Sequence, residues 1–183
     1  VYPVDTLRDD GISVTGFFYN PNIHPFKEFR RRLTTTEQYS ELTGMRLISD
    51  KNYGLVKFLR AVVNKENERC LYCYQERLEK TVQKARHEGF DSFSTTLLYS
   101  KYQNHSKIRQ ICEKLSKQYS VIFHYDDFRI GWQEGIDKSI DLNLYRQPYC
   151  GCIYSEQERY DKSLSSCRPA RKQDQTNSET ESK

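Results

Sequence analysis

The sequence has no apolar run long enough to cross a bilayer, and hydrophobic residues make up only 36% of its 183 positions. Residues 1–5 also lack the pattern of a signal or transit segment. These absences argue against a membrane protein and predict one that works in the cytoplasm. The length is still sufficient for one domain with a buried core.

Neither of the glycine-rich phosphate-binding patterns, GxGxxG and GxxxxGK[ST], occurs in the sequence, so no nucleotide cofactor is indicated. Charge of one sign is also scarce, because 29 Lys and Arg residues against 25 Asp and Glu residues leave a net charge of only +4. This balance is compatible with a polyanionic partner and does not require one. It gives no reason to expect a DNA partner.

Six cysteines occur without a secretory signal, so they do not indicate the disulfide framework of a small secreted protein. Four of them form two close pairs, Cys70 with Cys73 and Cys150 with Cys152. In a reducing compartment, paired thiols more often bind metals or carry out redox chemistry. Cys112 lies on the apolar face of a predicted helix, which indicates a core position.

The Cys-Gly-Cys segment, Cys150 to Cys152, is the most informative motif. Core packing gives two thiols no reason to be one residue apart. Such a pair can ligate a metal or close a small, easily reduced disulfide, and the residues alone leave both possibilities open. Cys70 and Cys73, spaced i, i+3 at the start of a predicted helix, share a face and can reach one metal. The positive end of the helix dipole predicts lowered pKa values for these two thiols.

Apolar periodicity predicts helices that alternate with strands. Strands are expected over residues 12–19, 45–48, 90–98 and 119–123. Helices are expected over residues 2–10, 53–64, 70–87 and 131–144 and around residues 108–115. Between the first two strands, one helix is expected to begin at residue 26, and a second is expected to run from a cap at residues 34–37 to residue 43. This alternation predicts an α/β fold in three layers, a mostly parallel sheet with flanking helices, Rossmann-like or HUP-like. We expect a single catalytic domain over residues 1–162 and a disordered, polar tail over 163–183, which includes Cys167.

Polar loops follow three of the predicted strands, at 20–22, 94–96 and 125–127. Because ligands bind at the carboxyl ends of parallel strands, these loops should line one edge of the sheet. His24 lies between two prolines, where a structural role is more common than a catalytic one. The run Arg30 to Arg32 is typical of a solvated helix face, although it could meet phosphates.

Several motifs, taken in their order and spacing, resemble the epoxyqueuosine reductases of the QueH type. The motifs run from near the first residue to about residue 160 and include Tyr19-Asn20-Pro21-Asn22-Ile23-His24-Pro25, Arg69-Cys70-Leu71-Tyr72-Cys73, Phe93-Ser94-Thr95-Thr96-Leu97-Leu98-Tyr99-Ser100, Tyr102-Gln103-Asn104-His105, Asp127-Phe128-Arg129 and Tyr145-Arg146-Gln147-Pro148-Tyr149-Cys150-Gly151-Cys152. The resemblance implies an enzyme for the last step of queuosine synthesis, which reduces epoxyqueuosine at the wobble position of tRNA. This two-electron, two-proton reduction releases the epoxide oxygen as water.

The same resemblance implies a [4Fe–4S] cluster and a redox-active disulfide, supplied with electrons by a donor of unknown identity. Carried over to this sequence, Cys70 and Cys73 are cluster ligands, and Cys150 and Cys152 are the redox pair. An additional iron is associated with the family, and we assign Asp127 to it. Asp127 or Tyr149 is the expected proton donor. The residues expected to bind the substrate are Asn20, Asn22, His24, Thr95, Thr96, Tyr102, Gln103 and Arg146.

One motif of the family is missing, namely an N-terminal strand that ends in an adjacent Cys-Cys pair and supplies two further cluster ligands. The sequence begins in the helix expected after that strand, so we expect it to be truncated, with the first strand of the sheet lost. Two other functions stay open. One is a non-catalytic RNA-binding module in which Cys70, Cys73, Cys150 and Cys152 hold zinc, and the other is a thiol oxidoreductase that acts on proteins.

Overall fold

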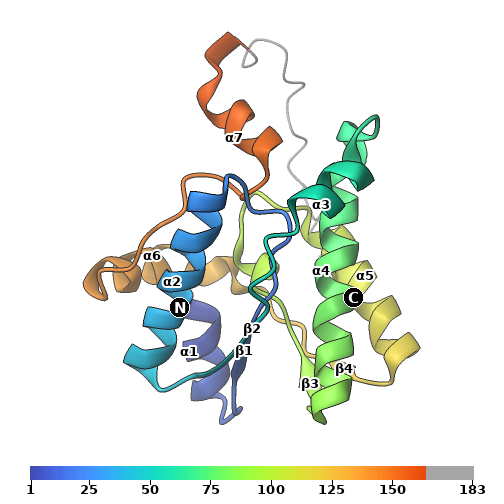
Figure 1. The fold of residues 1–183 in the computed structure, drawn as a ribbon. Helices are drawn as coiled ribbons and strands as arrows, with labels where there is room; N and C mark the ends of the chain where they lie inside the picture. Colours follow the sequence, from blue (N-terminus) through green and yellow to red (C-terminus); the bar gives the residue numbers. More distant parts are fainter. Residues whose placement is uncertain (164–183) are drawn as a thin grey trace, which may run out of the picture.

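The computed structural model describes residues 1–163 and shows helices packed around short strands (Figure 1). The strands are β1 (Thr15–Phe18), β2 (Arg46–Ser49), β3 (Ser92–Phe93) and β4 (Ile122–Phe123). The helices are α1 (Tyr2–Asp9), α2 (Phe26–Thr43), α3 (Leu55–Val62), α4 (Arg69–Glu88), α5 (His105–Tyr119), α6 (Trp132–Asp141) and α7 (Ile153–Tyr160), with short 3-10 helices η1 (Glu66–Glu68), η2 (Thr96–Tyr99) and η3 (Phe128–Gly131). The tail predicted to be disordered falls, from residue 164 onward, outside the residues that the structure describes.

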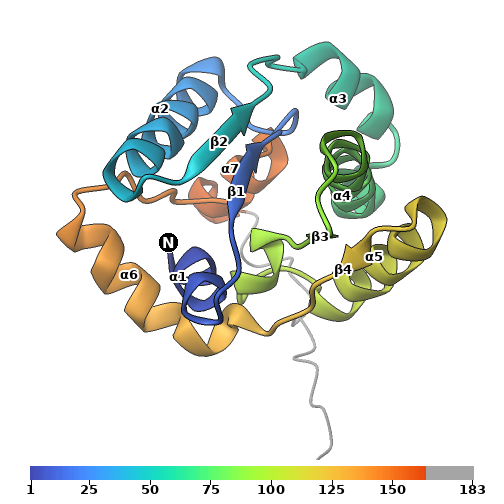
Figure 2. The ribbon, with the colours of Figure 1, turned by 90° about the horizontal axis from the view of Figure 1, so that it is seen from below.

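The strands form two parallel pairs instead of one continuous sheet. β1 pairs with β2 so that Phe18 lies opposite Ser49, and β3 pairs with β4 so that Phe93 lies opposite Phe123. Figure 2 shows the two pairs next to each other with helices around them, and within the described residues β1 and β3 are not hydrogen-bonded to each other. The α/β class and the parallel pairing are therefore confirmed, whereas the continuous sheet is not found in residues 1–163.

The region predicted as two helices, with a cap at Thr34–Glu37, is the single helix α2. The threonine hydroxyls do not cap a new helix. Thr35 donates to the carbonyl of Arg31 at 2.8 Å, and Thr36 donates to the carbonyl of Arg32 at 2.8 Å. Ser and Thr make such i−4 bonds inside helices, so the residues that favour a cap also fit a continuous helix. Gly44 ends α2 in the left-handed conformation, with a φ of 62°.

Two further differences concern the C-terminal half. The predicted strand 90–98 is only two residues long, because Thr95 leaves the strand and its hydroxyl accepts a hydrogen bond from the amide of Leu97 at the start of η2. The helix α7 has no counterpart in the sequence-based prediction. It begins directly after Cys152, whose sulfur accepts a bond from the amide of Ser155, a cap that residue preferences do not anticipate.

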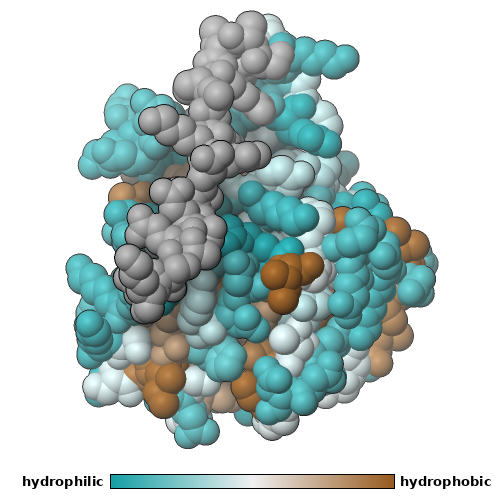
Figure 3. All heavy atoms as spheres, turned by 180° about the vertical axis from the view of Figure 1, so that it is seen from behind, coloured by the Kyte–Doolittle hydropathy of each residue, from teal (hydrophilic) through white to brown (hydrophobic). Residues whose placement is uncertain are grey.

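The largest buried cluster lies between α4 and α5 and includes Leu78, Val82, Ile108 and Cys112. Cys112 is fully buried there, as its position on the apolar face of its helix predicts. None of the helices within residues 1–163 combines the length and the apolar character needed to cross a membrane. The face shown in Figure 3 is mostly hydrophilic, with small and separate apolar patches.

Candidate functional site

The Cys-Gly-Cys segment is bound to the loop that follows β1. The amide of His24 donates to the carbonyl of Gly151 at 2.8 Å, and the hydroxyl of Tyr149 donates to the carbonyl of His24 at 2.5 Å. Gly151 has a φ of +128°, and a Cβ at this position would lie 2.9 Å from Cγ1 of Ile23. The glycine is therefore required by both its backbone conformation and the close approach of the two segments.

Arg32 holds the same segment from the side of α2. Its guanidinium donates to the carbonyls of Tyr149 and Cys150, both at 3.0 Å, and to the side chain of Gln147 at 2.7 Å. Its Nε donates to Glu28 at 2.7 Å. Arg32 is only 7% exposed, so the prediction of a solvated arginine face is wrong at this position. This residue, which sequence reasoning missed, fixes the backbone that carries the two thiols.

The two sulfurs of Cys150 and Cys152 lie 4.0 Å apart, close enough to share a proton. Ser155 connects them, because its hydroxyl is 2.9 Å from the sulfur of Cys150 and donates to the carbonyl of Cys152 at 2.8 Å. The hydrogen bond between the two cysteine side chains is the main cause of the lowered pKa of Cys150, and it acts against burial. The bond to Cys150, together with burial, raises the pKa of Cys152. Cys150 is therefore the more acidic of two coupled thiols.

Because its pKa is lowered, Cys150 should stay reactive at neutral pH. An ordinary thiol with a pKa of about 8.5 loses about eightfold in thiolate between about pH 8 and pH 7. We expect the iodoacetamide alkylation rate of Cys150 to fall by less than about twofold over this interval, measured by mass spectrometry of its tryptic peptide. Burial raises the pKa of Cys112 to about 12, so this thiol is the unreactive internal control.

The same measurement on a Cys152→Ala variant tests the cause, since the bond from Cys152 contributes most to the lowered pKa of Cys150. The alkylation profile of Cys150 should then move to higher pH. An eightfold loss of rate already in the parent protein would contradict the assigned thiolate.

Cys70 and Cys73 lie at the start of α4, beside the Cys-Gly-Cys segment. Tyr72 between them packs against the apolar cluster that contains Cys152 and Cys150. The charge of Cys150 contributes to the pKa of Cys73, which confirms that the two motifs are neighbours. The predicted lowering of the pKa is wrong for Cys73, because burial raises it to about 11 and outweighs the nearby Arg77.

Basic side chains surround these sulfurs. Arg69, at the first position of α4, forms an ion pair with Glu158 of α7 and lies 5.5 Å from the ring centre of Tyr154. Burial opposes the charge of Arg69, but the carboxylate of Glu158 outweighs it and raises the pKa of Arg69. The ion pair ties α7, and with it Cys152, to the helix that carries Cys70 and Cys73. Negative charge on the sulfurs is thus compensated from the start of α4.

The thiols of residues 1–163 do not form a complete metal site. Within this part of the chain, no group of three or more His, Cys, Asp or Glu side chains is placed to hold a metal ion. A four-thiolate zinc site built from Cys70, Cys73, Cys150 and Cys152 therefore finds no support in the geometry. A [4Fe–4S] cluster needs four thiolates, and Cys70 and Cys73 match only two of them.

The predicted substrate-binding residues after β1 come close to the thiols. Asn22 is 2% exposed, and its Nδ2 lies 3.4 Å from where a Cβ of Gly151 would be. His24 is fully buried between the rings of Tyr53 and Phe58, and burial lowers its pKa. His24 is thus a neutral side chain that supports the loop, and Asn20 precedes it in the same loop.

The residues predicted after β3 separate into two groups. Gln103 accepts a hydrogen bond at 2.8 Å from Tyr74, and burial together with the nearby sulfurs raises the pKa of Tyr74 to about 12. Gln103 is thus linked to the sulfur site through α4. Tyr102 is 71% exposed, and Thr96 is exposed as well, so both are accessible to a ligand. Thr95 is occupied as the cap of η2.

Asp127 lies after β4 and is engaged by Arg129 through two side-chain bonds of 2.7 and 2.6 Å. These bonds lower the pKa of Asp127 and keep it a carboxylate, which suits a metal ligand better than a proton donor. His105 approaches the same carboxylate at 3.6 Å. Tyr149, the other expected proton donor, is bound to His24, and burial raises its pKa. Arg146 is exposed on the segment that leads to Cys150.

The fold and the site define an α/β protein with two neighbouring thiols beside the loop at the carboxyl end of a parallel strand, which is the chemistry of a thiol-dependent oxidoreductase. Residues 1–158 match the family described as QueH: Epoxyqueuosine reductase QueH. The chain belongs to this family.

Two relatives bear the name Epoxyqueuosine reductase QueH, which is that of an oxidoreductase. The protein of Dehalococcoides mccartyi is 36% identical over 161 residues, which cover 88% of this chain and 88% of the relative. The protein of Thermotoga maritima is 36% identical over 159 residues, which cover 80% of this chain and 81% of the relative. The resemblance drawn from the sequence motifs is therefore confirmed.

Proposed function

We propose that this protein reduces epoxyqueuosine to queuosine at the wobble position of tRNA, with Cys150 and Cys152 supplying the two electrons. The observation that carries the proposal is a pair of cysteine sulfurs 4.0 Å apart, on a segment held by Arg32 and by the loop after β1, in a chain of the epoxyqueuosine reductase QueH family. A protein with this substrate is expected to act in the cytoplasm. The alternative of a zinc-binding RNA module lacks the ligand geometry, and the family favours tRNA over protein substrates.

In the first step, the Cys150 thiolate attacks one epoxide carbon. A carbon–sulfur bond forms, the carbon–oxygen bond at that carbon breaks, and the oxygen becomes an alkoxide on the neighbouring carbon. The Cys152 thiol carries the proton nearest to the reacting sulfur and can deliver it to this alkoxide. The raised pKa of Cys152 keeps that proton available at neutral pH, whereas Asp127 is already ionised.

In the second step, the Cys152 thiolate attacks the sulfur of Cys150. A disulfide forms, the carbon–sulfur bond breaks, its electron pair becomes the carbon–carbon double bond, and hydroxide leaves and is protonated to water. Two thiols are oxidised to one disulfide and the substrate is reduced by two electrons, so atoms and electrons balance. The sulfurs must approach by about 2 Å to reach the disulfide bond length.

Cys70 and Cys73 are proposed as two ligands of a [4Fe–4S] cluster, a group that transfers single electrons when bound. Because the described residues provide only two of four thiolates, no step above depends on the cluster. The three-layer, Rossmann-like or HUP-like sheet is part of this proposal, supported by the parallel pairing of β1 with β2 and of β3 with β4. Asp127 is kept as the ligand proposed for an additional iron.

Iron binding can be measured independently of activity. After anaerobic reconstitution with iron and sulfide, iron content and visible absorption should be lower in a Cys70→Ser variant than in the parent protein. Zinc without iron in protein purified without oxygen would support the zinc module instead. The substrate-binding residues Asn20, Asn22, Thr96, Tyr102 and Gln103 are proposed to bind the extruded nucleotide by hydrogen bonds and stacking.

A single-turnover experiment tests the proposed function. The protein is reduced, the reductant is removed without oxygen, and excess tRNA that contains epoxyqueuosine is added. We expect about one queuosine per active chain, because one dithiol supplies one electron pair. The products are counted by mass spectrometry of nucleosides, and the disulfide is identified in the peptide that contains both thiols. Absence of queuosine with fully reduced thiols, or product without thiol oxidation, would contradict the proposal.

A further inference from the structure

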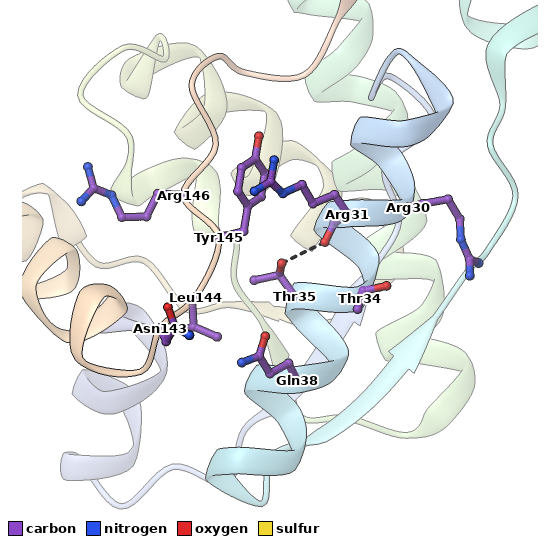
Figure 4. A pocket seen from close by; sticks show the side chains of 9 residues that line it. All are labelled: Arg30, Arg31, Thr34, Thr35, Gln38, Asn143, Leu144, Tyr145 and Arg146. Atoms are coloured by element: carbon purple, nitrogen blue, oxygen red, sulfur yellow. Dashed lines mark hydrogen bonds between the residues drawn. The ribbon is translucent and has the colours of Figure 1, made fainter.

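A groove lies between α2 and the segment that connects α6 to the Cys-Gly-Cys segment (Figure 4). Its volume is about 590 Å³. Arg31 lines the groove from α2 with its guanidinium over the ring of Tyr145, and Arg146 lines the opposite side with its side chain directed away from α2. No acidic residue lines the groove. The position of these charges, rather than the small net charge of the chain, indicates an anionic ligand.

The contacts of Tyr145 hold one wall of the groove in place. The guanidinium of Arg31 lies 3.6 Å from the centre of the Tyr145 ring, and the hydroxyl of Tyr145 donates to the carboxylate of Glu28 at 2.9 Å. That carboxylate is also bound by Arg32, so its charge is compensated away from the groove. Arg31 is exposed on its outer face and can still donate to a ligand.

The remaining lining is polar. The side chain of Gln38 points from α2 toward Asn143 on the opposite side, and Thr34 also lines the groove. Thr35 is already committed to the carbonyl of Arg31. Arginine side chains and neutral donors along one groove match phosphate oxygens, which arginine binds in bidentate geometry.

The groove lies close to the thiol site along the chain. Arg146 precedes Cys150 by four residues, so at most about 14 Å of extended backbone separates them. Through Glu28, Tyr145 of the groove is connected to Arg32, which donates to the carbonyl of Cys150. A strand with its reacting nucleotide at Cys150 can therefore reach the groove.

We propose that this groove binds the phosphodiester backbone of the RNA strand next to the nucleotide that reacts at Cys150. The inference rests on the proposed function and adds the place where the anticodon strand lies. A cationic groove with an aromatic ring is typical of sites for single-stranded nucleic acid, whereas an acidic protein partner gives no reason for a ring against one of the cations. Arg31 and Arg146 are the residues assigned to the phosphates.

The test compares two exposed double variants of the full chain. Arg31→Gln with Arg146→Gln removes the groove cations, and Lys114→Gln with Lys117→Gln removes the same charge from α5, on the other side of the molecule (Figure 2). The probe is an unmodified anticodon stem-loop RNA, and the Kd is measured by fluorescence anisotropy in a salt series. Two lost phosphate contacts should weaken binding about 25-fold at about 0.1 M salt and reduce the slope of log K against log salt by about 1.4. The control variant should bind within about twofold of the parent.

Equal affinity of the two double variants would overturn the proposed groove, while the reductase function would stand if the parent still forms queuosine. A groove variant that binds RNA like the parent but turns over slowly with a protein electron donor would assign the groove to that acidic donor and likewise overturn the proposal. A parent protein that neither binds the RNA nor forms queuosine would overturn the proposed function and the groove together.

Discussion

Replacement of Arg32 by methionine should lower the free energy of unfolding by about 3–5 kcal/mol, because it breaks a buried ion pair and leaves one charge behind. The side chains of Arg32 and Glu28 are only 8% and 11% exposed. Methionine matches the volume and removes the donors to Glu28, Gln147 and two backbone carbonyls. Tyr145 is then the remaining donor to a buried carboxylate.

The free energy is measured by urea denaturation followed by circular dichroism. Arg30→Met is the matched control, since Arg30 lies two residues earlier on the same helix and is exposed. Its effect should stay within about 0.5 kcal/mol. A midpoint for Arg32→Met equal to that of Arg30→Met would show that the buried contacts of Arg32 add no net stability.

A second substitution separates stability from positioning. Arg32→Met combined with Glu28→Leu removes both charges, so part of the lost stability should return. The carbonyls of Tyr149 and Cys150 still lose their donor, so the segment should remain displaced. We therefore expect both Arg32→Met and the double variant to shift the pH profile of Cys150 alkylation and to slow single turnover, because both lose these contacts. If the alkylation profile and the single-turnover rate both returned to those of the parent protein, Arg32 would have a structural role only.

The burial of Arg32 could have been read from the helical period. Phe29 and Leu33, which are fully buried, lie three residues before it and one residue after it, so Arg32 falls on the inner face of α2. Three consecutive arginines suggested a common solvated face, but residues 30 and 31 point outward and only residue 32 points inward. An arginine inside an apolar helical pattern is a signal for a buried partner, here the carbonyls of a distant loop.

Local patterns predicted most elements, because apolar period, glycine stops and turn residues are properties of short segments. Local patterns could not tell whether the two parallel pairs join into one sheet. Such joining depends on contacts between strands that are far apart in the sequence. The pKa of Cys73 shows the same limit. The helix N-terminus is visible in the sequence, whereas the burial that raises the pKa is a tertiary property.

Cys152→Ser should lower the rate of queuosine formation by at least about 1,000-fold and trap a covalent adduct between Cys150 and the RNA. Serine cannot attack sulfur to form a disulfide, so the reaction halts after the Cys150 thiolate has opened the epoxide. Cys150→Ser should be equally inactive and form no adduct, because it lacks the nucleophile. The two variants differ only in which of the two neighbouring sulfurs is replaced by oxygen, and each serine keeps the shape of the cysteine that it replaces.

The adduct is measured by denaturing gel electrophoresis of labelled RNA and located by mass spectrometry of the peptide that contains Gly151. Cys112→Ala is the control, since this thiol lies in the α4–α5 core and its loss should leave the single-turnover yield unchanged. Loss of the Cys152 thiol also removes the main cause of the lowered pKa of Cys150, so adduct formation should speed up as the pH rises. Queuosine formed at the parent rate by Cys152→Ser would refute the dithiol mechanism. An adduct on Cys150→Ser would instead reverse the roles of the two sulfurs.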